Sequence, residues 1–169
     1  MSESLLEDAF AHHVWATLQL FAACLELSPE QLDTAVPGTY GSILDTARHL
    51  VGADSRYLFD TSGGRTARID EDHMDLPEIR ATMEAHGAAW SQLLGGGLDP
   101  DAVRVRRRAD GSETHAPVSI RIAQALHHGT DHRSQICTAL TMLGVEPPVI
   151  DVWAFGGLDG RVVEVPPTS

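Results

Sequence analysis

The chain has 169 residues, a length that fits one domain with a sizeable hydrophobic core. Hydrophobic residues make up 43% and charged residues 21%, which are fractions of an ordinary globular protein and exclude a wholly disordered chain. The formal net charge is −12 and all twelve basic residues are arginine, which argues against nucleic acids and anionic membranes as partners, because both need a basic face.

Two sequence features bear on the cellular location, and both lead to the same expectation. No apolar run approaches the roughly 18 residues that a membrane-spanning helix needs. The acidic first residues lack the basic region of a secretory signal. We therefore expect a cytoplasmic protein, in which Cys24 and Cys137, each inside an apolar helical pattern, are reduced core residues.

The first half of the chain predicts two long helices. Apolar residues recur at helical spacing over residues 5–27, and Pro29 ends that helix because the residue before a proline leaves the α region. After a turn-rich loop, Ser42 is typical of an N-cap, with Asp45 in the position that completes a capping box. A second helix is expected from there to about Phe59.

The second half predicts two more helices and a hairpin. A polar, acidic connection over residues 61–75 leads to a third helix over 76–94, and three glycines end it. Residues 102–116 alternate in polarity around an Asp-Gly turn, as in a β-hairpin. Pro117 precedes a fourth helix that is expected to run to Leu143, and a short helical turn is expected over 151–155.

These elements define the expected fold class. It is an all-α protein, a four-helix bundle with long crossover connections and a small β-hairpin between helices three and four. We expect residues 1–169 to form a single domain. Because the connection between helices two and three is long, the sequence does not require a simple up-down-up-down order of the helices.

Histidine is the informative residue type, with nine in the chain. His128 and His132 are four residues apart in the fourth helix, so their rings project from one face, one turn apart. The same face carries Ile136 and Leu140 and points into the bundle. Two buried imidazoles need partners for their nitrogens, and a metal ion would satisfy one nitrogen of each ring. The spacing is also found in pairs that are solvated or hydrogen-bonded.

A third ligand has to come from another helix, and His49 is the only histidine in helix two. Three imidazoles from two helices would leave coordination positions open, as a catalytic metal site does and a structural zinc site does not. Imidazole ligands suit zinc, nickel, copper or iron, and the spacing does not choose among them. The alternative for His49 is a histidine at the core edge with a backbone partner.

Three sequence motifs resemble the DinB/YfiT family of four-helix metalloproteins. They are HVWA from His13, YGSI from Tyr40 followed by ARHLV from Ala47, and HGTDHRSQI from His128. The resemblance implies a DinB-like bundle and a site for one divalent transition metal, zinc or nickel, held by His49, His128 and His132. It also implies a small-molecule substrate, a low-molecular-weight thiol as a candidate cofactor, and a candidate homodimer.

Other residues near the motifs are candidates for the pocket or for contacts to the ligands. His13 stands where many relatives carry asparagine, and could be a fourth ligand, a pocket acid or base, or a packed helix residue. Asp131 could orient a ligand ring or be solvated. Gln135, three residues after His132, could hydrogen-bond a ligand ring.

The leading hypothesis is a metal-dependent enzyme, a thiol S-transferase or hydrolase that activates a water or a low-molecular-weight thiol. The alternative is a non-catalytic metal-containing binding or stress-response protein, which the lack of a glutamate adjacent to the histidines favours. A third reading is a structural bundle whose histidines only pack. The substrate, the native metal and the catalytic residues remain open at the level of sequence.

Overall fold

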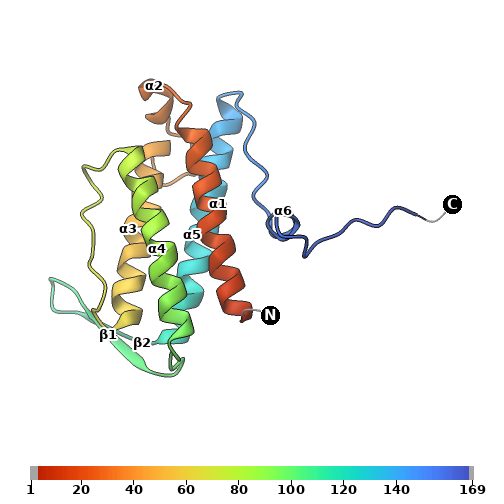
Figure 1. The fold of residues 1–169 in the computed structure, drawn as a ribbon. Coiled ribbons are helices and arrows are strands. Elements are labelled where there is room, and N and C mark those ends of the chain that lie inside the picture. Colours follow the sequence, from red (N-terminus) through yellow and green to blue (C-terminus); the bar gives the residue numbers. More distant parts are fainter. Residues whose placement is uncertain (1–3, 168–169) are drawn as a thin grey trace.

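Four long helices packed side by side form the body of the protein (Figure 1). The computed structural model describes residues 4–167. The long helices are α1 (Leu5–Cys24), α3 (Ile43–Ser62), α4 (Leu76–Gly95) and α5 (Val118–Met142). The expected all-α bundle is therefore confirmed.

The helix starts follow the local chemistry that the sequence offers. Ser4 and Asp75 form complete capping boxes at α1 and α4. At α3 the hydroxyl of Ser42 accepts a hydrogen bond from the backbone N–H of Asp45, but the expected return bond from Asp45 is not formed. Its carboxylate lies 3.7 Å from Arg48 instead. Aspartate has one methylene fewer than the glutamate or glutamine that usually closes this box.

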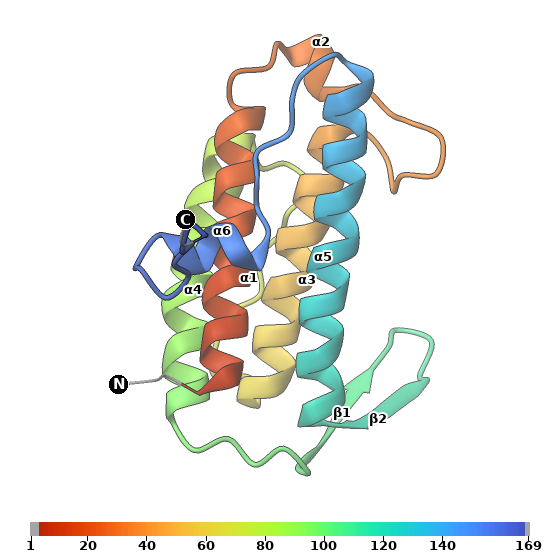
Figure 2. The same cartoon turned by 90° about the vertical axis from the view of Figure 1, so that its right-hand side faces the viewer.

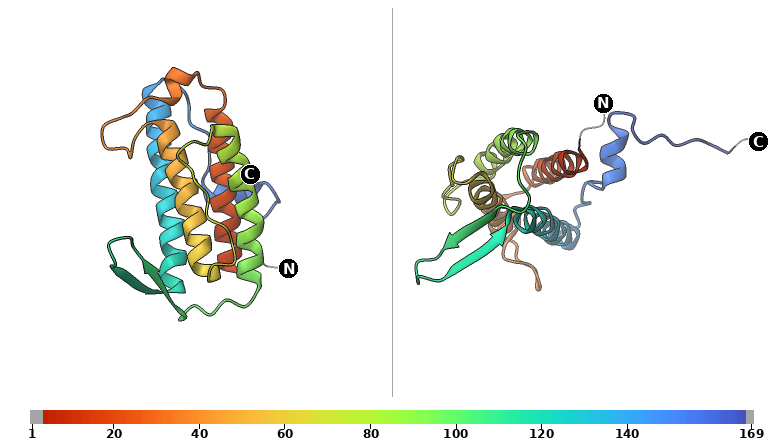
Figure 3. Two further views of the ribbon diagram at one scale, coloured as in Figure 1. Left: turned by 90° about the vertical axis from the view of Figure 1, so that its left-hand side faces the viewer. Right: turned by 90° about the horizontal axis from the view of Figure 1, so that it is seen from below.

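The helices run up, down, down and up. After α3 descends, residues 63–75 return along the length of the bundle, so that α4 starts at the same end as α3 (Figure 1). Helix α1 packs against α4 and α5, and α3 packs against the same two helices, so α1 and α3 are diagonal (Figure 3). The expected long crossover is thus the connection between α3 and α4.

The smaller elements include one helix that the sequence analysis did not predict and the hairpin that it did. Helix α1 ends at Cys24, three residues before the expected end, because Ser28 caps a separate short helix, α2 (Pro29–Leu32). Strands β1 (Val103–Arg107) and β2 (Glu113–Pro117) pair antiparallel at the end of the bundle where α5 begins.

The core has two apolar layers with a polar layer between them. One apolar layer contains Leu20, Leu50 and Ile136 among others, and the second contains Phe10, Leu58, Trp90 and Ile122 among others. Between these positions on the four helices lie buried polar residues, namely His13, Asp54, His86 and Arg133. The polar layer therefore crosses the middle of the bundle.

The C-terminal segment leaves the bundle after α5. It crosses the outside of α1 and α5 and contains α6 (Val152–Gly157) (Figure 2). Trp153 of α6 is 75% exposed. A largely apolar cavity of about 940 Å³ lies between this segment, α1 and α5. Among residues 4–167, no helix has the length and apolar character needed to cross a membrane.

Candidate metal centre

The three histidines singled out in the sequence meet at the seam between α3 and α5. The Nε2 atom of His128 lies 3.1 Å from Nε2 of His49 and 3.1 Å from Nε2 of His132. One ligand nitrogen from each ring lies within 4.8 Å of the others. His132 is 8% exposed, and the other two are partly buried. The fold therefore brings together residues that are 79 positions apart in the chain.

Gln135 fixes the tautomer of the His132 ring, that is, which ring nitrogen carries the hydrogen. Its side-chain Oε1 accepts a hydrogen bond of 3.0 Å from the backbone N–H of Tyr40, so that atom is the carbonyl oxygen. The same oxygen lies 3.1 Å from Nδ1 of His132, which must therefore carry the hydrogen and donate it. The lone pair of His132 is then on Nε2 and points at the cluster, as a metal ligand requires.

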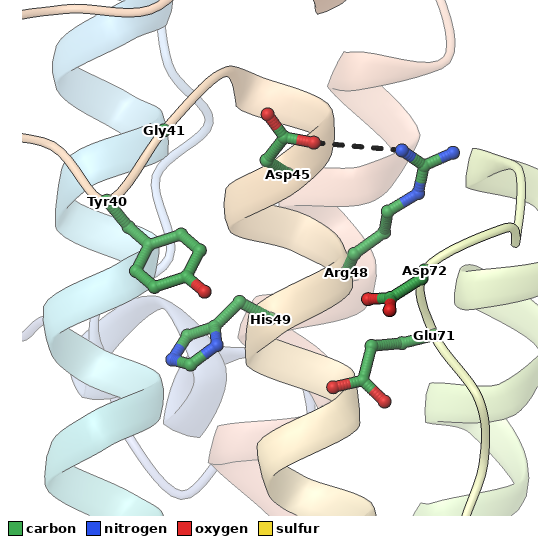
Figure 4. A pocket seen from close by; sticks show the side chains of 7 residues that line it. All are labelled: Tyr40, Gly41, Asp45, Arg48, His49, Glu71 and Asp72. Carbon is green, nitrogen blue, oxygen red and sulfur yellow. Dashed lines mark ion pairs between the residues drawn. The ribbon is translucent and has the colours of Figure 1, made fainter.

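Two tyrosines hold the other two rings. The Tyr40 ring stacks on His49 at 3.9 Å between centroids and 16° between planes, as Figure 4 shows. The Tyr57 ring meets His128 edge to face at 5.8 Å. These contacts restrict ring rotation, so the nitrogens are oriented before any ligand arrives.

The environment disfavours the protonated form of His49 and His128. Burial, followed by the positive charges that His132 and His49 would carry, lowers the pKa of His128 to about 4. Burial and the charge on a protonated His132 also lower the pKa of His49. A metal ion binds only the unprotonated form, so it meets little competition from protons at neutral pH.

The donor set fits a divalent transition metal. Tetrahedral bonds of about 2.0–2.1 Å from nitrogen to zinc place two ligand nitrogens about 3.3 Å apart, close to the two observed separations. Without an ion the contacts are poorly satisfied, because the Nε2 atom of His128 has one hydrogen at most and faces two other nitrogens. A shared cation satisfies all three lone pairs.

His13 does not join this cluster. Its Nε2 atom lies 3.2 Å from Oδ1 of Asp54, and Nη1 of Arg133 donates to its Nδ1 at 2.9 Å. Both nitrogens therefore have protein partners, and the ring is 1% exposed. Asp131 is exposed, and its side chain makes no hydrogen bond within residues 4–167. Of the three additional candidates, Gln135 alone touches a ring of the cluster.

Asp54 is the centre of the buried polar layer. Besides His13 on α1, its carboxylate accepts hydrogen bonds of 3.1 Å from the indole N–H of Trp90 and lies 2.8 Å from Nδ1 of His86, both on α4. Burial would raise the pKa of Asp54, but the nearby imidazoles of His13 and His86 outweigh it and hold the pKa well below its usual range. The carboxylate is thus ionised and joined to Arg133 on α5 through His13.

Gly129 makes this arrangement possible. A Cβ at this position would lie 2.3 Å from Cε1 of His13, so only glycine lets α5 approach the ring so closely. Because Gly129 follows His128 directly, the same turn of α5 carries the close contact to α1 on one side and a metal-ligand candidate on the other.

A cavity of about 310 Å³ opens beside His49 (Figure 4). Tyr40, Gly41 and three residues of the first turns of α3 line one side, and Glu71 and Asp72 line the other. Glu71 belongs to the connection over residues 63–75, and a Cβ on Gly52 would lie within 2.1 Å of its side chain. The connection therefore lies directly on α3 and brings a glutamate into the cavity next to His49.

Sequence reasoning missed several of these residues for identifiable reasons. Glu71 is distant from the histidines in the chain, and only the crossover brings it near them. Arg133 sits beside His132 in the sequence, but its burial depends on the approach of α1. The available signal was Asp54, a charged residue within the apolar pattern of helix two.

The fold and the histidine cluster define a class, the four-helix bundle proteins with a candidate three-histidine metal site between the second and fourth long helices. A family model of the DinB family matches residues 1–158, and the chain belongs to that family. Among curated proteins no match to the chain is found.

Proposed function

We propose that this protein is a metal-dependent enzyme in which His49, His128 and His132 hold one divalent transition metal, zinc or nickel. The observation that carries the proposal is the convergence of three imidazole nitrogens, one of them with its tautomer fixed by Gln135, beside a cavity. When bound, such an ion supplies Lewis acidity and lowers the pKa of a water or thiol that reaches it.

The chain's own residues have separate roles in this proposal. Gln135 keeps Nδ1 of His132 protonated and its Nε2 lone pair directed at the ion. Tyr40 covers the His49 ring and lines the cavity through which a small substrate would approach. Three protein ligands leave positions for a substrate or a low-molecular-weight thiol, in agreement with a thiol S-transferase or hydrolase activity.

The test is the metal content of tag-free protein, measured by inductively coupled plasma mass spectrometry after growth with zinc and nickel. We expect about one ion per chain in the wild type, and its loss in His132→Ala. His127→Ala is the matched control, because that histidine lies on the same helix but is exposed and outside the cluster, and it should retain the ion. A wild type without metal, or a His132→Ala variant that keeps it, contradicts the proposal.

Activity is tested on the loaded wild type and the same two variants. Thiol transfer to electrophiles and ester or amide hydrolysis are the two reaction classes to screen. Turnover that requires both the ion and His132 supports an enzyme. Stable metal binding with saturable small-molecule binding but no turnover in either class supports the non-catalytic alternative.

A further inference from the structure

The large cavity between the C-terminal segment, α1 and α5, which we call the α6 cavity, has no role in the proposed function. The histidine cluster lies between α3 and α5, whereas the α6 cavity lies where α6 crosses the bundle (Figure 2). Its volume of about 940 Å³ is in the range of sites that take small molecules. The α6 cavity is therefore a second candidate binding site on this chain.

The outer wall of the α6 cavity is fixed to α1 by direct contacts. The Nε2 atom of His12 donates a hydrogen bond of 2.9 Å to the backbone carbonyl of Ile150, because a carbonyl oxygen only accepts. The ring of Phe155 lies 5.7 Å from the His12 ring. Arg161 forms an ion pair of 2.6 Å with Asp8. The segment that covers the cavity is thus packed on the bundle as part of the fold.

Most of the cavity lining is apolar. The helices of the bundle contribute Leu5, Ala9 and Leu126, and the C-terminal segment contributes Ile150, Trp153 and Phe155. Apolar surface that is left in contact with water costs free energy, and a contiguous apolar surface of this size is typical of a binding site. An apolar ligand would remove that surface from water.

One buried charged side chain, Arg133, also lines the cavity. Its guanidinium reaches from α5 to α1, where Nη1 donates hydrogen bonds to His13 and Thr17, and Nη2 donates to Thr130 on its own helix. Among the described residues, the Nε atom of Arg133 makes no hydrogen bond. Because Arg133 is only 5% exposed, a donor with so little access to water is costly to leave without an acceptor. A ligand atom that accepts a hydrogen bond would remove this cost.

The charges in the lining favour an uncharged ligand. Two arginines, Arg133 and Arg161, stand against two carboxylates, Asp8 and Asp151, so the lining has no formal net charge when its histidines are neutral. Asp8 is paired with Arg161, and Asp151 caps the N-terminus of α6. A charged ligand would upset this balance, and an anion would also be repelled by the net charge of −12.

We propose that the α6 cavity binds an uncharged, apolar small molecule with one hydrogen-bond acceptor, such as an aliphatic ketone or ester. The apolar chain packs against the walls of the cavity, and the oxygen accepts a hydrogen bond from Nε of Arg133. The inference does not depend on the metal, because none of the three clustered histidines lines this cavity.

The test is the binding of 2-nonanone to the full-length protein, measured by isothermal titration calorimetry. We expect saturable binding of about one ketone per chain. Ala9→Phe should abolish the binding, because the added ring fills the cavity from α1. Ala11→Phe is the matched control, since Ala11 is an exposed residue of the same helix that does not line the cavity, and it should bind the ketone like the wild type.

Two further measurements test the chemistry of the ligand. Arg133→Met should weaken 2-nonanone binding about tenfold, the usual effect of losing one hydrogen bond to a charged group, with circular dichroism as the check on folding. Nonanoate, an anion of the same chain length, should bind the wild type more weakly than the ketone.

Equal ketone affinity in the wild type and Ala9→Phe would overturn the inference, and this outcome does not depend on how well Arg133→Met folds. Tighter binding of nonanoate than of the ketone would refute the uncharged class. Full affinity in a folded Arg133→Met would refute the role of its Nε donor. A wild type that binds no ketone also overturns the inference, whether the cavity stays empty or sedimentation velocity shows that a second copy of the chain covers it.

Discussion

Replacing Asp54 by asparagine should destabilise the protein by about 3 kcal/mol. Breaking a buried charge pair on one side costs about 3–5 kcal/mol, because the remaining charge is left without its partner. Here that charge is on Arg133, which is 5% exposed and joined to Asp54 through His13. Asparagine keeps the shape of the side chain and one oxygen that can accept the hydrogen bond from the Trp90 N–H. The expected loss of unfolding free energy is therefore at the lower end of that range.

The measurement is urea unfolding of the metal-free protein at pH 7, followed by circular dichroism, so that loss of metal does not contribute. Asp45→Asn is the control on the same helix, since Asp45 is 54% exposed and lies 3.7 Å from Arg48. Its expected cost is below about 1 kcal/mol. A loss below about 1 kcal/mol for Asp54→Asn would refute the view that the carboxylate is an ionised centre of the polar layer.

Three further predictions test the site and its support. The pKa of His128 is about 4 when folded and near 6.5 when unfolded, so the unfolded chain binds the extra proton between these values, and the metal-free protein should lose stability as pH falls from 6.5 to 4. The loss should stay well below the limit of about 1.4 kcal/mol per pH unit, because solvent screens a ring that is only partly buried. Urea titrations across this window should show a shallower loss for His128→Gln, and an equal slope would contradict the assignment. Gly129→Ala should lower the free energy of unfolding by about 1–3 kcal/mol, since displacement of the His13 ring outweighs the gain in helix propensity. In the same assay Gly157→Ala should be neutral or stabilising, because its added methyl group meets no atom within 4 Å. Gln135→Leu should weaken zinc binding about 10–100-fold in a chelator competition, because the adjacent ligand imidazole loses its acceptor, and Gln135→Glu, which keeps an acceptor, should retain most of the affinity.

Much of the fold could be predicted because its signals are local. Helical periodicity, the Ser42 cap and glycine or proline stops predicted α3, α4 and α5 to within about three residues at each end, and the Asp-Gly turn predicted the hairpin. The separate helix α2 is not predicted, because Pro29, which ends the first helix, is also the first residue of α2 after its Ser28 cap. The direction of α4 stayed open because the length of a connection does not say which end of the bundle it reaches.

Some residues of the candidate site could also be predicted from local sequence patterns, and others could not. His128 and His132 were predictable from their spacing on one helix, and His49 was identified as the remaining histidine of helix two. Their convergence at 3.1 Å needs the packing of α3 on α5, which no local pattern encodes. Glu71 depends on the path of a polar connection without periodicity, and for that reason it could not be placed beside His49 in advance.

Helix α5 links the stability of the bundle to the geometry of the site. His128 and His132 present nitrogens to α3, while Gly129 and Arg133, each one position later, face His13 on α1. Successive residues on a helix are about 100° apart, so the same two turns serve both faces. A change that moves α5 away from α1 must also move the ligand pair relative to α3. The buried polar layer therefore does more than satisfy its own charges: it sets the position of α5, and through it the distance between the imidazoles that would share a metal ion.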